Sequence, residues 1–64
     1  MPKTDVHVEL SGQDGNVFFI IGRITKALKR ADKSQLAEEF ADKAMSAGSY
    51  NEVLRLAFEY VEVE

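Results

Sequence analysis

The sequence predicts a small α+β domain of the order β-α-α-α-β, in which two short terminal strands pair against a layer of three helices. Two observations support this prediction. At both ends of the chain, apolar residues alternate with polar ones, which is typical of a strand with one buried face. Between the ends, three segments repeat their apolar residues at helical spacing. A three-helix bundle with extended tails is the alternative architecture.

The first expected element is a strand over residues 5–10, because Val6, Val8 and Leu10 alternate with polar residues. The next five residues, 11–15, read SGQDG, and this composition favours a turn. A strand followed by a tight turn is therefore expected to bring the chain to its first helix.

The first helix is expected over residues 16–31. Asn16 is a suitable N-cap, because its side-chain oxygen can accept hydrogen bonds from the free amides of the first turn. Gly22 falls in the middle of this helix, and we expect a neighbouring element to approach closely there, with a flat spot for a ligand as the alternative. The residues expected on the apolar face are Val17, Ile20, Ile21, Ile24, Ala27, Leu28 and Ala31.

A capping box formed by Asp32 and Gln35 predicts the start of the second helix. This helix is expected to run to about Ala47 and to stop at Gly48 in the left-handed conformation. The residues expected on its inner face are Leu36, Phe40, Ala44 and Ala47.

A second capping box, Ser49 with Glu52, predicts the third helix, which is expected to end near Glu59 or Tyr60. Beyond it, the alternating residues 61–64 predict a last short strand. The residues expected at apolar positions of the third helix are Val53, Leu54, Ala57, Phe58 and Val61.

Composition limits how so small a domain can be stabilised. We expect residues 1–64 to form one domain, with residues 1–4 disordered. Domains of this size usually need a disulfide, a metal ion or a partner chain. The chain has no cysteine and one histidine, so neither a disulfide nor a zinc site is expected. We expect no metal and no cofactor, which leaves a second copy of the chain as the available aid.

The sequence has no apolar run near the roughly 20 residues that a membrane span requires. Its first residues, MPKTD, lack the pattern of a signal peptide. A cytoplasmic protein with no membrane partner is therefore expected. The formal net charge of −3 argues against indiscriminate binding to nucleic acid or anionic lipid.

The glycines of the stretch SGQDGNVFFIIG, residues 11–22, do not fit a phosphate-binding loop. Six residues separate Gly15 from Gly22, and Arg23 follows, whereas a P-loop needs four residues and then Gly-Lys-Ser/Thr. Asp14 would also repel an anion. A turn followed by an N-cap explains these residues. We find no catalytic constellation either, and expect that the protein is not an enzyme.

Charge is distributed unevenly along the chain. Residues 17–33 carry five cations and one acid, for a net +4, whereas residues 34–64 carry two cations and seven acids, for a net −5. On the first helix, Phe19 and three cations follow one stripe at i, i+4, i+7 and i+11, opposite the apolar face. The candidate binding residues are Phe19, Arg23, Lys26, Lys29, Arg30 and Lys33.

Three interpretations of this basic face remain open. It could anchor a protein partner, or it could bind nucleic acid or another polyanion, with cations on phosphates and Phe19 stacked on a base. The third interpretation is structural: the terminal strands or the third helix cover Phe19, and the cations form a solvated face. We expect a small protein-interaction module, with self-association as one form and polyanion binding as the alternative.

The stretch DGNVFFIIGRITKALKRA, followed by EEF and by GSYNEVLRLAFEYVEVE, resembles small uncharacterised proteins of bacteria and their phages. The similarity extends over nearly the whole chain from Val6. The resemblance implies an accessory protein of a bacterium or phage. It implies no activity, so no functional residue is transferred.

Overall fold

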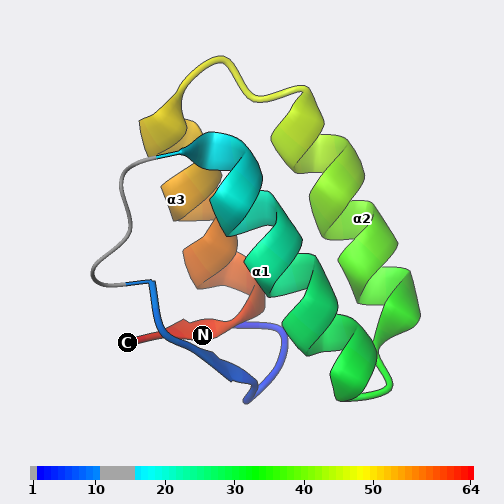
Figure 1. Ribbon diagram of the computed structural model, residues 1–64. Helices are drawn as coiled ribbons and strands as arrows, with labels where there is room; N and C mark the ends of the chain where they lie inside the picture. Colours follow the sequence, from blue (N-terminus) through cyan, green and yellow to red (C-terminus); the bar gives the residue numbers. More distant parts are fainter. Residues whose placement is uncertain (1, 11–15) are drawn as a thin grey trace.

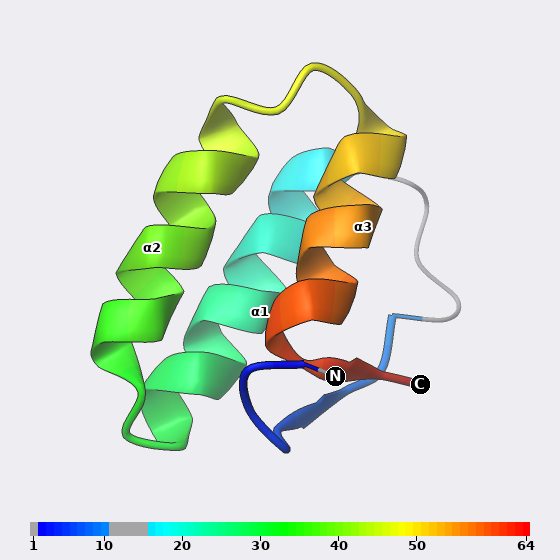
Figure 2. The same cartoon turned by 180° about the vertical axis from the view of Figure 1, so that it is seen from behind.

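The computed structural model describes residues 2–10 and 16–64, and the turn expected over residues 11–15 lies outside them. The elements follow the predicted order (Figure 1). They are β1 (His7–Val8), α1 (Val17–Arg30), α2 (Ser34–Met45), α3 (Tyr50–Tyr60) and β2 (Glu62–Val63). The three helices lie side by side, and both strands cross near one end of this layer, as Figure 1 and Figure 2 show. The described part of the chain is mostly helical, with a small two-stranded sheet.

The two strands are parallel neighbours, with His7 opposite Glu62. The backbone N–H of Glu62 donates to the Val6 carbonyl at 2.8 Å, and the N–H of Glu64 donates to the Val8 carbonyl at 2.9 Å. The predicted pairing of the terminal strands is therefore confirmed, and it occurs within one chain. Parallel strands need a long crossover connection, which the three helices provide.

The first helix, α1, begins as its sequence predicts, but the placement of Ala31 on its apolar face is wrong. The Asn16 side chain accepts a hydrogen bond from the Phe18 N–H at 2.9 Å, which confirms Asn16 as the N-cap. Ala31 is exposed, because it follows the last helical residue. The rest of the predicted apolar face meets the core, where the buried residues are Ile20, Ile21, Ile24 and Leu28 and the partly buried ones are Val17 and Ala27.

The predicted capping box at the start of α2 is wrong, because Asp32 closes α1 instead. Asp32 has a φ of 64°, in the left-handed region. Its N–H donates to the Lys29 carbonyl at 3.0 Å, and the N–H of Lys33 donates to the Leu28 carbonyl at 2.8 Å. This pair of hydrogen bonds forms a helix-closing turn that is usually built on glycine. The N-cap position of α2 is then taken by Lys33, without a side-chain cap.

The end of α2 also differs from the prediction. α2 ends at Met45, with Ser46 as its C-cap, rather than near Ala47. Gly48 does not take the left-handed conformation. Its N–H donates to the carboxylate of Glu52 at 2.7 Å, so Gly48 belongs to the start of α3. The buried residues of α2 are Ala37, Phe40 and Ala44, whereas the predicted Leu36 and Ala47 are partly buried.

The third helix, α3, is capped by Ser49 as predicted, since its side chain accepts from the Glu52 N–H at 3.3 Å. The helix ends at Tyr60, as predicted. The placement of Phe58 on the apolar face is wrong: Phe58 is 57% exposed, and Tyr60 lies in the core instead. The buried face continues from Ala57 by a step of three residues, which leaves Phe58 at its side.

Gly22 lies on an exposed part of α1. Apart from α1 itself, a β-carbon added to Gly22 would meet no atom of the described residues within 4 Å, so the predicted close approach of another element is wrong. Nothing in the surrounding packing therefore requires glycine at this position.

The start of the chain is tied to the helices by Lys3 and Thr4. The Thr4 hydroxyl donates to the Tyr60 carbonyl at 2.7 Å and accepts from the Val6 N–H at 3.1 Å. Lys3 Nζ donates to the Glu39 carboxylate at 2.8 Å, and the Tyr60 hydroxyl donates to the same carboxylate. The hydrogen bonds from Lys3 and then from Tyr60 lower the pKa of Glu39 to about 2. These contacts position the segment that leads into β1.

Candidate functional site

The residues predicted to bind a partner lie along α1 and its C-terminal turn. Phe19, Arg23, Lys26 and Arg30 keep the predicted stripe and are all exposed. Phe19 is 47% exposed, so neither the strands nor α3 bury it. The guanidinium carbon of Arg23 lies 6.0 Å from the centre of the Phe19 ring, at the outer limit of a cation–π contact. The aromatic ring and the first cation of the stripe are therefore neighbours.

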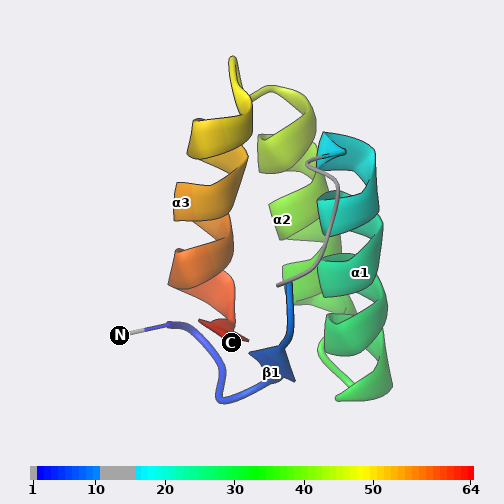
Figure 3. The same ribbon diagram turned by 60° about the vertical axis from the view of Figure 1, so that its left-hand side comes forward.

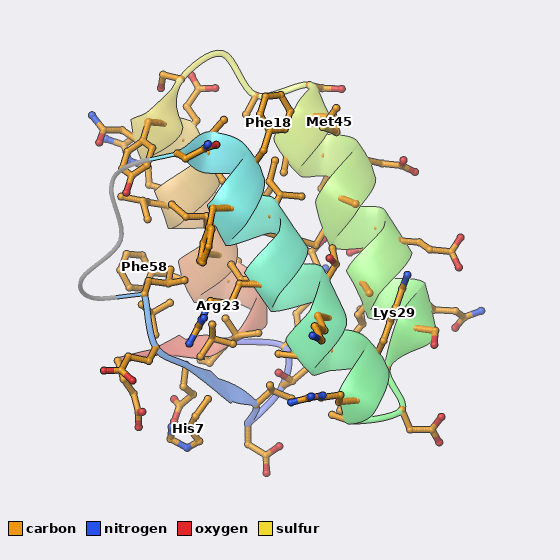
Figure 4. The ribbon with its side chains drawn as sticks, in the orientation of Figure 1. His7, Phe18, Arg23, Lys29, Met45 and Phe58 are labelled. Atoms are coloured by element: carbon orange, nitrogen blue, oxygen red, sulfur yellow. The ribbon has the colours of Figure 1, made fainter. Side chains whose placement is uncertain are left out.

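The three cations of the stripe line a groove between α1 and β1, which we call the basic groove. Its volume is about 520 Å³. With three basic side chains and one acidic one, its formal charge is +2 (3 − 1, His7 neutral). Figure 4 shows Arg23 extending from α1 toward β1. The lining residues are Val6, His7, Val8, Glu9, Arg23, Lys26, Ala27, Arg30 and Ala31.

Lys29 and Lys33 do not line the basic groove. Lys29 lies on the α2 side of α1, away from Arg23, as Figure 4 shows. Lys33 is partly buried in the turn between α1 and α2, where its N–H closes α1. Lys29 instead meets Lys26 and Arg30 in a separate hollow on α1, which these three residues line with Thr25. Four of the six predicted binding residues thus follow the stripe, and Lys29 and Lys33 lie outside it.

The cations of the basic groove are available to a ligand. Within the described part of the chain, the basic partners in the ion pairs are Lys3, Lys43 and His7, and none comes from α1. Arg30 also stands in the last turn of α1, where a cation stabilises the negative end of the helix dipole. Among residues 2–10 and 16–64, no carboxylate is therefore within salt-bridge distance of Arg23, Lys26 or Arg30.

A second surface lies at the other end of α1, and we call it the apolar groove. It forms where the start of α1 meets the end of α2 and the start of α3, and its volume is about 260 Å³. Phe18 and Met45 are 66% and 63% exposed and lie next to each other at its rim (Figure 4). The lining residues are Val17, Phe18, Ile21, Ala44, Met45, Ala47, Gly48, Ser49, Tyr50 and Val53. None of them is charged, in a chain whose residues are 30% charged.

The sequence prediction did not find the apolar groove. Phe18 belongs to neither the apolar face of α1 nor its basic stripe, and Met45 is the last residue of α2. From the sequence alone, each of the two is expected to be an isolated exposed apolar residue, and such residues are common in proteins. They become neighbours because α1 and α2 run in opposite directions (Figure 1). The one available signal was two adjacent Phe residues in the first turn of a helix, only one of which the stripe explains.

Among residues 2–10 and 16–64, no three His, Cys, Asp or Glu side chains are placed to share a metal ion. In the same residues, no buried side-chain polar atom lacks a hydrogen-bond partner. No described helix combines the length and the apolar character that crossing a bilayer requires.

Comparison of the chain with protein families, with curated proteins and with solved structures finds no match.

Proposed function

We propose that the protein is a non-enzymatic interaction module that binds a second copy of itself through the apolar groove. The observation that carries this proposal is the uncharged lining of the groove, together with the exposure of Phe18 and Met45 at its rim. A contiguous exposed apolar surface costs free energy in water, and such surfaces commonly mark contacts with other proteins.

The shape of the apolar groove supports a second copy as the partner. A twofold dimer brings the same patch of both copies together, so that patch has to complement itself. Here Phe18 and Met45 project beside a hollow in the same surface. The hollow of one copy can receive a projecting side chain of the other.

The charge and the size of the chain also favour this contact. Two copies with a net charge of −3 each repel at long range. A contact made of uncharged residues adds no local repulsion to that. A domain of 64 residues without cysteine also gains stability by burying further apolar surface against a partner.

Sedimentation velocity over a concentration series tests self-association. We expect the wild-type chain to shift from monomer to dimer as its concentration rises, and Phe18→Ser to stay monomeric throughout. Because Phe18 is largely exposed, this substitution should change the stability of the monomer by no more than about 0.5 kcal/mol. A wild-type chain that is monomeric even at millimolar concentration contradicts the proposal.

Phe58→Ser is the matched control for this experiment. Phe58 is also an exposed phenylalanine, but it does not line the apolar groove. We expect this variant to dimerise like the wild type. Loss of the dimer in Phe58→Ser, with the dimer kept in Phe18→Ser, would place the contact elsewhere.

Polyanion binding through the basic face of α1 is the second candidate function. Its support is that Arg23, Lys26, Lys29 and Arg30 are exposed and form no salt bridge with the described residues. The test is the salt dependence of binding to a single-stranded oligonucleotide. If phosphates are bound, log K should fall linearly with log salt, by about 0.7 for each phosphate. Absence of binding at low salt would dismiss this candidate.

We also propose that the fold is better classed as α+β than as a three-helix bundle. The support is that Val8 of β1 and Val61, next to β2, are buried in the same cluster as the helix residues. Val8→Ala should therefore lower the free energy of unfolding by about 2 kcal/mol, as a core substitution does. A change below about 0.5 kcal/mol in urea unfolding would favour a helical bundle with dispensable tails.

A further inference from the structure

The edge of β1 that runs along the basic groove suggests a second binding function, independent of self-association. We propose that the basic groove binds an extended acidic peptide segment of a partner protein. The segment would pair with β1 as an added strand and would place its carboxylates against the cations of α1.

The backbone of β1 leaves one edge open. The carbonyls of Val6 and Val8 accept from the β2 segment, and the N–H of Leu10 donates to the Glu64 carbonyl at 3.3 Å. Successive residues of a strand direct their backbone groups to opposite edges. The N–H and C=O of His7 therefore point away from β2, and neither group is bonded to a turn, loop or helix cap among the described residues. An open edge of this kind is a template for another strand.

The basic groove lies on this open side of β1. α1 contacts β1 but not β2, so β1 stands between β2 and α1, as Figure 3 shows. On the α1 side, the groove is lined partly by Ala27 and Ala31, whose side chains are small. A peptide in the groove would have a strand edge on one side and a helix on the other.

The cations of α1 determine the side chains that such a peptide would carry. Arg23, Lys26 and Arg30 line the groove and form no salt bridge with another described residue. Side chains of a strand alternate in direction, so every second residue of the peptide can face these cations. Carboxylates at those positions would pair with them, and arginine can hold a carboxylate through two parallel hydrogen bonds. The net charge of the groove favours an acidic segment for the same reason.

The groups that line the basic groove match those of a peptide better than those of a nucleic acid. Proteins hold single-stranded nucleic acid largely by stacking bases on aromatic side chains. The lining residues of the basic groove include no Phe, Tyr or Trp. A nucleic acid also lacks the alternating N–H and C=O groups that pair with the open edge at His7.

The probe for this proposal is a synthetic six-residue peptide of alternating Val and Glu, blocked at both ends. Titration into the ¹⁵N-labelled chain should shift the amide resonances of His7 and Arg23. Hydrogen exchange should slow at the His7 N–H, because the peptide backbone would accept its hydrogen bond. Exchange at the Glu62 N–H should stay as it is, since that group already donates to Val6 in the free protein.

Two controls separate strand pairing from attraction between charges. A peptide with the same side chains but N-methylated amides keeps its carboxylates and cannot pair as a strand, so it should bind at least about tenfold more weakly. Arg30→Gln should weaken binding of the unmodified peptide by about three- to tenfold. Lys29→Gln should leave it unchanged, because Lys29 stands in the same last turn of α1 but outside the groove.

Three results would overturn the proposal. The first is no change in the amide resonances with excess peptide at low salt. The second is equal affinity for the N-methylated peptide, which would exclude strand pairing. The third is tighter binding, at the same resonances, of an oligothymidylate of equal charge, which would assign the groove to nucleic acid. All three measurements can be made on the Phe18→Ser variant, which is expected to be monomeric. A failure of peptide binding is then distinguishable from a failure of self-association.

Discussion

Lys3 Nζ lies 2.8 Å from the carboxylate of Glu39, although 36 positions of sequence separate the two residues. Lys43 Nζ lies 3.8 Å from the same carboxylate, and the Tyr60 hydroxyl donates to it. Lys3 Nζ also stands 4.7 Å from the centre of the Tyr60 ring. One carboxylate on α2 thus joins the start of the chain to the end of α3, next to the two paired strands.

The pKa of Glu39 predicts how stability changes in acid. Hydrogen bonds from Lys3 and then from Tyr60 lower this pKa from 4.5 to about 2. A carboxyl group whose folded pKa is lowered contributes stability above its unfolded pKa and loses that contribution as the pH falls through its folded pKa. The contribution of Glu39 should therefore be complete above about pH 4.5 and should disappear toward about pH 2.

Thermal unfolding of the wild type and of Glu39→Gln, from neutral pH to about pH 2, measures this contribution. The wild type should have the higher Tm at neutral pH, and the difference should vanish toward pH 2. Glu38→Gln, at an exposed neighbouring position, should show a smaller effect. A difference between wild type and Glu39→Gln that stays constant over this range would rule out the assigned pKa.

The stability that Lys3 contributes should change with pH in the opposite direction, because it is lost in alkali and not in acid. Its pKa is raised above 10.5, chiefly by the hydrogen bond to Glu39. A raised folded pKa gives a contribution that is complete below the unfolded pKa and is lost as the pH rises through the folded one. The advantage of wild type over Lys3→Met in Tm should therefore hold at neutral pH and decline above about pH 10.5. An advantage that grows with rising pH would contradict the ion pair.

Gly22→Ala should stabilise the protein by about 0.5–1 kcal/mol, because alanine favours a helix more than glycine does and the added methyl group meets no neighbour. Urea unfolding gives the value. Gly48→Ala is the control, since Gly48 lies outside the helices and should give a change within about 0.5 kcal/mol. Destabilisation by Gly22→Ala would mean that another element or a second copy contacts this position.

Asp32→Gly should also be stabilising, by about 1 kcal/mol, because glycine adopts the left-handed φ of 64° without a steric cost. The substitution also removes a negative charge beside the negative end of the α1 dipole. Asp42→Gly, inside α2, should lower stability instead. Chemical denaturation of both variants tests this, and a loss of stability in Asp32→Gly would contradict the helix-closing role of Asp32.

The order of the elements could be predicted from the sequence because each element carries a local signal. The period of the apolar residues distinguishes strands from helices, and Asn16 and Ser49 mark two helix starts with side-chain hydrogen bonds. The turn at Asp32 could not be predicted in the same way. An aspartate before a helix can cap that helix or close the previous one, and tertiary packing decides between the two.

The binding surfaces were predicted less completely than the fold. The basic stripe follows from helical spacing within α1, so Arg23, Lys26 and Arg30 could be placed together in advance. The basic groove also needs β1 beside this stripe. The position of β1 depends on its parallel pairing with β2, which the local sequence pattern does not specify. The apolar groove depends on helix direction, since Phe18 and Met45 belong to different helices and meet only when α1 and α2 pack in opposite directions.

Isotope-filtered NOE spectroscopy can show whether two copies meet through the apolar groove. In an equal mixture of labelled and unlabelled chains, we expect intermolecular NOEs between the Phe18 ring of one copy and the Met45 methyl group of the other. Phe58, outside the groove, should show none. Absence of intermolecular NOEs at a concentration where the chain sediments as a dimer, or NOEs that centre on Phe58, would contradict the claim.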